Sequence, residues 1–155
     1  MKEYFINLFR YENHANKEVT ECLLSADMPP EKAISLMSHI VNAQEIWLRR
    51  ITGKAYDTNS VWKTISKSEL RTASKNSSEA MTAYISSLQE SDLEKNIEYT
   101  NIKGDFFTSR LKDIITHLLF HSSYHRGQVI LLMKPVVNEL PSTDYIKFAR
   151  DNDIK

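Results

Sequence analysis

The chain has 155 residues, and its 20 basic side chains balance 20 acidic ones, so the formal net charge is zero. That length suits one domain over residues 1–155, and the balanced charge gives no electrostatic reason to expect nucleic acid or a membrane as a partner. A single cysteine, Cys22, excludes an internal disulfide framework, and no apolar run has the length of a signal-peptide core or a membrane span, so we expect a cytoplasmic protein.

A first helix is predicted over residues 3 to about 26, because apolar residues recur there at helical spacing. Glu12 and Asn16 fall in the middle of the same helical face. A carboxylate and an amide on a buried face need partners, so either the two residues line a polar cavity, as a candidate pocket, or the face is open to solvent at this point. The apolar members of the face are Phe5, Leu8, Phe9, Val19 and Leu23.

A second helix is predicted from Glu31 to about Thr52, after Pro29 and Pro30 end the first one and with Gly53 as its C-cap. His39 falls at the edge of the apolar face of this helix. It is either a hydrogen-bonded boundary residue or, if another helix supplies a pair of histidines, a metal ligand. The apolar face consists of Leu36, Ile40, Ala43 and Trp47.

Residues 54–65 show no clear periodicity and exceed the usual turn between helices, so we expect them to cross over the end of a bundle. The segment from Ser66 to Glu69 matches a capping box and opens a third helix that ends near Gln89. We interpret the serine-rich segment from Ser74 to Ser78 as solvated helix surface. The predicted apolar face is Leu70, Ala73, Met81, Tyr84 and Leu88.

A short extended segment or hairpin is predicted in residues 91–107, and a fourth helix from near Thr108 to the stop at Pro135. Gly127 lies inside this helix, where it marks either the close approach of another backbone or a tolerated defect. The apolar residues of the helix are Leu111, Ile114, Ile115, Leu118, Leu119, Val129, Ile130 and Leu132. The tail is expected to pack back over the bundle through Tyr145, Ile146 and Phe148.

Three histidines of the fourth helix, His117, His121 and His125, are spaced at i, i+4 and i+8. Neutral imidazoles one helical turn apart can share an ion, as in the helical zinc motif of metalloproteases. The glutamate of that motif is missing, so no general base can be assumed. Histidines of an ordinary core or surface are the alternative interpretation.

Four amphipathic helices with one histidine on the second and a pair on the fourth allow a three-imidazole site in the core of an all-α four-helix bundle. Such a set leaves coordination positions open, as catalytic zinc does. By ligand type it suits zinc, nickel, iron or copper, and we expect a divalent metal, zinc or nickel before iron or manganese. An open metal could generate hydroxide near neutral pH or bind and deprotonate a thiol.

The chain resembles the DinB family, whose DinB/YfiT-like superfamily includes bacterial thiol S-transferases. The fourth-helix segment ending in His121-x-x-x-His125-Arg126-Gly127-Gln128 carries the resemblance most specifically, together with His39. The other matching segments are Tyr11 to Asn16, where His14 replaces the usual tryptophan, Ser38 to Trp47, Gly104, and Thr143 to Tyr145.

The resemblance implies that His39, His121 and His125 ligate a divalent metal and that His117 is a flanking residue. It also implies a four-helix bundle with a crossover and a homodimer. Arg126 and Gln128 lie on other faces of the helix than His125, and their role is open between structure and function.

We therefore expect a metal-dependent enzyme, an S-transferase in which the metal activates a low-molecular-weight thiol for attack on a small electrophile. A metal-dependent hydrolase with Glu12 as its base is the second interpretation. A non-catalytic, metal-binding stress-response dimer is the third. Cys22 is expected in the core and has no part in the chemistry.

Overall fold

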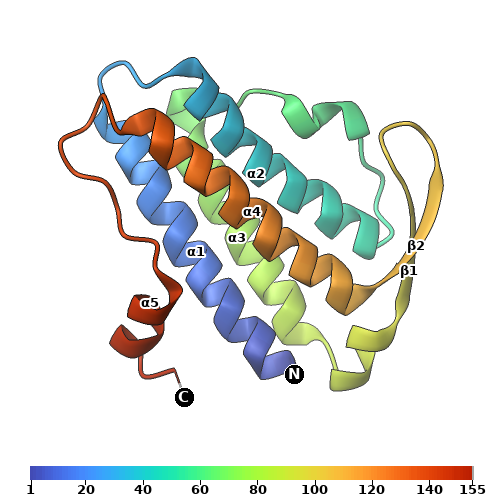
Figure 1. Cartoon of the computed structure of the whole chain (residues 1–155). Helices are drawn as coiled ribbons and strands as arrows, with labels where there is room; N and C mark the ends of the chain where they lie inside the picture. Colours follow the sequence, from blue (N-terminus) through green and yellow to red (C-terminus); the bar gives the residue numbers. More distant parts are fainter. Residues whose placement is uncertain (155) are drawn as a thin grey trace.

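Four long helices pack side by side in the computed structural model of the protein, which describes residues 1–154 (Figure 1). Lys155, the last residue of the predicted domain, lies outside the described residues. The predicted four-helix bundle is confirmed, with helix ends within three residues of those expected from the sequence. The helices are α1 (Lys2–Ser25), α2 (Glu31–Ile51), α3 (Lys67–Ser87) and α4 (Leu111–Met133).

Residues 54–65 form the predicted crossover, but they run along the length of the bundle and not over its end. Helices α1 and α4 begin at the lower end of the bundle in Figure 1, and α2 and α3 begin at the upper end. Since α2 and α3 run in the same direction, the chain must return to the upper end between them, and it does so through the 3-10 helix η1 (Thr58–Trp62). Helix α2 packs mainly against α3 and α4, and α1 packs mainly against the same two helices.

Two apolar clusters fill the ends of the bundle, and a polar layer lies between them. Phe9 and Ile115 belong to the lower cluster, and Leu23 and Met133 to the upper one. Burial of apolar side chains at both ends supplies the main driving force for folding. The buried polar residues between them include Glu12, Asn16, Gln44, Ser78, Ser122 and Arg126.

Helix α3 begins next to Ser66 as predicted, but the capping box does not form there. The Ser66 hydroxyl donates to the Glu69 carboxylate and makes no capping bond to the helix backbone. A capping box forms instead between Gln89 and Asp92, at the start of the 3-10 helix η2 (Glu90–Glu94).

The interpretation of Ser74 to Ser78 as solvated surface is wrong for the two serines at its ends. Ser74 and Ser78 are buried, whereas Lys75 and Asn76 between them are exposed. The hydroxyl of Thr20 on α1 donates to Ser74 over 3.4 Å. This face of α3 packs against α1, and small side chains fit there because the space between the two helices is narrow.

The predicted hairpin is confirmed as two antiparallel strands, β1 (Asn96–Thr100) and β2 (Phe106–Arg110), with Asn96 opposite Arg110. Gly104 in its turn has a φ of +85°, a conformation that suits glycine. Pairing of β2 with β1 delays the start of α4 to Leu111, three residues after the predicted start at Thr108.

The C-terminal helix α5 (Tyr145–Asp151) packs on α1 through Tyr145 and Phe148, as predicted, with ring centroids 5.2 and 5.7 Å from that of Tyr11. Ile146 does not join them, since it points to solvent with 60% of its surface exposed. A Cβ at Gly127 would meet no atom within 4 Å, so close approach of a backbone does not explain this glycine in the described chain. No helix formed by residues 1–154 is long and apolar enough to cross a membrane.

Candidate metal centre

Three histidines from two antiparallel helices meet halfway along the bundle. His39 on α2 is buried, and His121 and His125 on α4 are half-buried. One ring nitrogen from each lies within 4.8 Å of the others, a grouping that could hold a metal ion. The structure thus brings together the three residues that the sequence singled out.

Two of the three nitrogens are almost as far apart as metal ligands. Nε2 of His39 lies 2.9 Å from Nε2 of His121. Two imidazole nitrogens on a tetrahedral zinc ion are about 3.3 Å apart, because each zinc–nitrogen bond is about 2.0–2.1 Å long. The pair would need to separate by only a few tenths of an ångström to accept an ion.

Protein acceptors orient two of the three rings. Nδ1 of His39 donates to the carbonyl oxygen of Val61 over 3.0 Å, which leaves the lone pair on Nε2, facing His121. Nδ1 of His125 donates to Oε1 of Gln128 over 2.9 Å and leaves its Nε2 free in the same way. Such hydrogen bonds fix the ring orientation and tautomer of metal-binding histidines. Gln128, whose role the sequence left open, therefore supports the histidine cluster.

His121 has the least support from the protein. Its Nδ1 is buried and has no hydrogen-bond partner anywhere in residues 1–154. Burial, together with repulsion by His39, His125 and His117, lowers the pKa of His121 to about 3. Burial also lowers the pKa of His39. Both rings are accordingly neutral at pH 7, which is the form that binds metal.

The crossover segment covers one side of the cluster. The Trp62 ring stacks on the His39 ring, with centroids 3.7 Å apart and planes 5° apart. Lys32 places its ammonium group 5.6 Å from the Trp62 ring. Sequence reasoning missed Val61 and Trp62, because a segment without periodicity gives no indication of what it contacts. The adjacent apolar residues Val61 and Trp62 in the crossover were the available signal.

His117 stands apart from the cluster. It is exposed, and its ring lies 5.6 Å from that of His121 and 5.8 Å from that of Trp47. This position agrees with the expectation of a flanking residue.

Glu12 and Asn16, the candidate pocket residues, lie in a buried network with Arg126. Nη1 of Arg126 donates to Oε2 of Glu12 over 2.6 Å and to Oδ1 of Asn16 over 2.9 Å. The other Glu12 oxygen accepts from Asn16 and from Gln44 over 3.1 and 3.0 Å. Glu12 and Asn16 are both buried, so this face of α1 is not open to solvent, and neither residue lines the two hollows described below.

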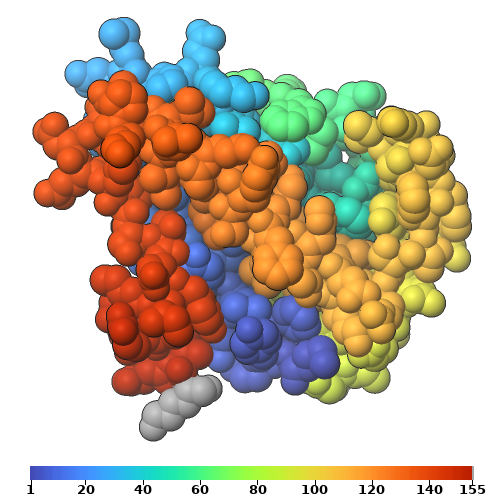
Figure 2. Space-filling model, viewed as in Figure 1, coloured from blue at the N-terminus to red at the C-terminus, as the bar shows by residue number. Residues whose placement is uncertain are grey.

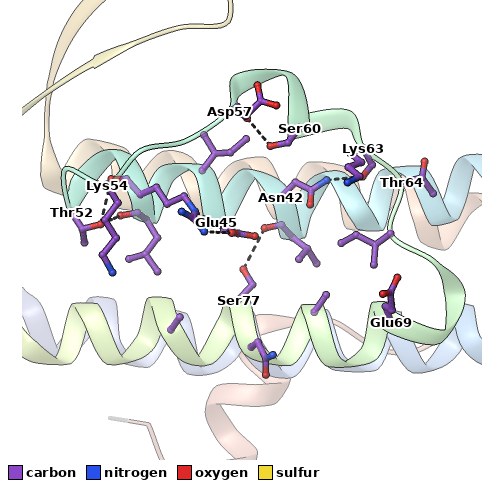
Figure 3. Close-up of a pocket in the computed structure, with 18 residues that line it drawn as sticks. Asn42, Glu45, Thr52, Lys54, Asp57, Ser60, Lys63, Thr64, Glu69 and Ser77 are labelled. Atoms are coloured by element: carbon purple, nitrogen blue, oxygen red, sulfur yellow. Dashed lines mark hydrogen bonds and ion pairs between the residues drawn. The ribbon is translucent and has the colours of Figure 1, made fainter.

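Two hollows adjoin α2, and only one of them reaches the histidines. A cavity of about 100 Å³ lies beside His39 and His121. A groove of about 900 Å³ lies on another face of α2, between the crossover and α3 (Figure 3). Two polar contacts cross this groove: Asn42 on α2 donates to the carbonyl oxygen of Lys63, and the hydroxyl of Ser77 on α3 donates to the carbonyl oxygen of Val41. The smaller cavity is lined by His39, Ala43, Ile46, Trp47, Arg50, Thr58, Val61, Ile102 and His121.

Comparison with curated proteins gives no match. The model of the DinB family matches residues 29–153, a region that runs from the start of α2 through α5 and contains all three clustered histidines. Since the match spans most of the chain, the protein belongs to the DinB family.

Proposed function

We propose that His39, His121 and His125 bind a divalent metal ion, zinc or nickel before iron or manganese. Three observations support this: the nitrogens converge, two rings are held in the required tautomer, and the pKa values favour neutral imidazoles. Three protein ligands leave a coordination position for a substrate. When bound, the metal would supply Lewis-acid activation of that substrate.

We further propose that the protein is a thiol-dependent S-transferase. The observation that carries the proposal is the three-histidine cluster, of which His39 and His121 line a cavity that can receive a small molecule. In the reaction the thiol sulfur bonds to an electrophilic carbon, the leaving group departs with its electron pair, and the thiol proton passes to solvent. No protein nucleophile is required, and Cys22 on α1 is free and half-buried.

The hydrolase interpretation is less well supported, because it needs a base. Both oxygens of Glu12 already accept hydrogen bonds from Arg126, Asn16 and Gln44. A non-catalytic, metal-binding stress-response protein of the cytoplasm is the remaining alternative. It would bind metal but would not catalyse the reaction of a thiol with an electrophile, whereas the transferase would.

Metal analysis tests the site. Protein purified without a polyhistidine tag should contain one metal ion per chain, and His121→Ala should lose it. His117→Ala is the matched control, since it removes a neighbouring imidazole outside the cluster, and it should keep the metal. Wild-type protein without stoichiometric metal would contradict the proposal.

Thiol addition tests the chemistry. In cobalt-substituted protein, a low-molecular-weight thiol should change the cobalt absorption spectrum, and the same thiol with a small electrophile should be consumed faster than without protein. An unchanged spectrum and no turnover across a panel of thiols would leave the non-catalytic alternative.

We also propose that the protein forms a homodimer through the outer face of α4, which lies uncovered in Figure 2. Phe120, Tyr124 and Leu131 are 67–72% exposed there and surround Gly127. In an antiparallel pairing, Tyr124 of one protomer would lie over the partner's Gly127, which would explain a glycine that costs a helix about 1 kcal/mol.

Leu131→Glu should give a monomer in light scattering. Ile146→Glu, a change of an exposed residue elsewhere, should not.

A further inference from the structure

Arg50, in the last turn of α2, is enclosed by aromatic rings from three elements. Its guanidinium carbon lies 4.5 Å from the ring centroid of Trp47, 5.1 Å from that of Tyr56 and 5.3 Å from that of Tyr99. These rings come from α2, the crossover and β1. The guanidinium is therefore held in place by rigid groups, at the junction of the bundle with the hairpin.

No acidic side chain neutralises this arginine. Within residues 1–154, the ion pairs of the protein do not include Arg50. Nη2 donates to the carbonyl oxygen of Thr100 over 2.8 Å, and Nε is buried without a partner. Aromatic faces stabilise a cation but do not satisfy its N–H groups. The Arg50 guanidinium therefore keeps an uncompensated positive charge and an N–H group that is free to donate.

Arg50 lines the same small cavity as His39 and His121. Figure 2 shows the surface hollowed between the hairpin and α4, with residues of α2 at the bottom. Thr58 and the exposed Ile102 also line the cavity, the latter from the hairpin turn. A molecule held at the histidines thus has the arginine within its own binding space.

We infer that Arg50 binds a carboxylate of the small molecule that occupies this cavity. The inference rests on the proposed metal site and names the class of its ligand: a small acid with a carboxylate a few bonds from the sulfur or from the reacting carbon. A guanidinium donates two parallel hydrogen bonds to a carboxylate, with which its planar shape is matched. A cavity of about 100 Å³ has room for such a group and a short carbon chain, whereas drug-sized ligands need about 300–1,000 Å³.

A purely structural role for Arg50 makes a different prediction. The hydrogen bond to Thr100 joins α2 to β1. If Arg50 served only to hold these two elements together, its replacement would lower the stability of the protein and leave ligand preference unchanged. Selectivity between charged and uncharged ligands therefore distinguishes the two roles.

The experiment compares two thiols that differ in one charge, 3-mercaptopropionate and its methyl ester, by titration of the cobalt-substituted protein. Direct attraction between carboxylate and metal is the same in all variants, so the effect of Arg50 is the change in the ratio of the two dissociation constants. Arg50→Gln should lower the preference for the acid by at least about tenfold, the usual size of a charge-assisted hydrogen bond, and should leave the ester unchanged. Arg49→Gln is the matched control: it removes an exposed guanidinium one residue away, paired with Glu45, and should keep the preference.

The same ratio in wild type and Arg50→Gln would overturn the inference. If Arg50→Gln fails to fold, as judged by circular dichroism, Arg50→Met replaces it, since methionine removes the charge but keeps an unbranched side chain, and an undiminished preference for the acid in that variant would overturn the inference equally. Failure of the metal site is distinguishable, because the protein would then take up no cobalt and both proposals would fall. Cobalt uptake with a thiol-induced spectral change, but without any effect of Arg50, would remove only the role of the arginine.

Discussion

Two polar clusters lie in the middle of this bundle, and neighbouring residues of α4 belong to each. Arg126 points into the network with Glu12 on α1, while His125 points to the cluster with His39 on α2. The first cluster combines a cation with an anion and amides, and its short contacts satisfy both carboxylate oxygens, while Nη2 of Arg126 is buried without a partner. The second combines three bases without an acid: Nε2 of His39 and Nε2 of His121 share one hydrogen bond, and Nδ1 of His121 has no partner. A cluster whose opposite charges compensate each other inside the protein indicates a structural role, whereas buried bases that meet without an acid indicate a ligand from outside.

The largest effect is expected from His121→Ala. Loss of a ligand should abolish stoichiometric metal binding, because even groups that only orient ligands contribute about 10–100-fold to metal affinity. The metal-free variant should fold as the wild type does, since His121 has an unpartnered nitrogen in the protein alone. Metal content and thermal unfolding of the metal-free protein measure the two quantities. A His121→Ala variant that keeps its metal would show that His121 is not a ligand, and the histidine cluster would no longer differ from the Glu12–Arg126 network in this respect.

The opposite pattern is expected from Glu12→Ala. Arg126 would keep its buried charge without a counterion, so the free energy of unfolding should fall by about 3–5 kcal/mol in urea titrations. Glu21→Ala, which breaks an exposed ion pair with Arg71, is the control and should have a much smaller effect. The metal content of folded Glu12→Ala protein should stay at one ion per chain. Little loss of stability would show that the network is not the structural cluster that its hydrogen bonds indicate.

A smaller change is expected from Gln128→Ala, which removes the acceptor that orients His125. Metal affinity should fall by about 10–100-fold, and stability of the metal-free protein should change little. Competition with a chelator measures the affinity. Gln128→Glu restores an acceptor on the same side chain and should recover most of the loss. Equal affinities in all three proteins would place Gln128 outside the metal site.

The sequence predicted where the residues of the two clusters lie on their helices, but not which partners they contact. Helical spacing is a local property, so it located His39 and the α4 histidines on faces that could meet, and it placed Glu12 on a buried face. The partner of Glu12 is Arg126, 114 positions away, and periodicity shows that a face is buried without showing what buries it. Val61 and Trp62 were missed for a related reason, because their contacts with His39 depend on the path of a crossover that has no repeating pattern.

The serines of α3 illustrate the limit of composition. Ser74 and Ser78 are polar and lie in a serine-rich segment, yet both are buried, because α1 and α3 approach closely at that point. These serines are buried because their side chains are small, although they are polar. Helix identity could therefore be predicted from periodicity, and the choice of His39, His121 and His125 over His117 from the family resemblance, while the packing of polar residues against other helices required the fold.

The smallest effect is expected on the pH dependence of stability in the metal-free protein. The pKa of His121 is lowered to about 3 in the folded state, against about 6.5 in the unfolded chain. Between these values the unfolded state binds more protons, so the free energy of unfolding falls as the pH is lowered from about 6.5 toward about 3, and His121 contributes nothing to this slope above that window. Urea titrations across this window should show a shallower slope for His121→Gln, with a difference of less than one proton per molecule because the ring is only half-buried. Added metal should steepen the slope of the wild type alone, since a bound ion must be displaced by protons. Identical slopes for both metal-free proteins would mean that His121 takes up a proton as readily in the folded protein as in the unfolded chain, and would remove the physical reason for expecting a metal there.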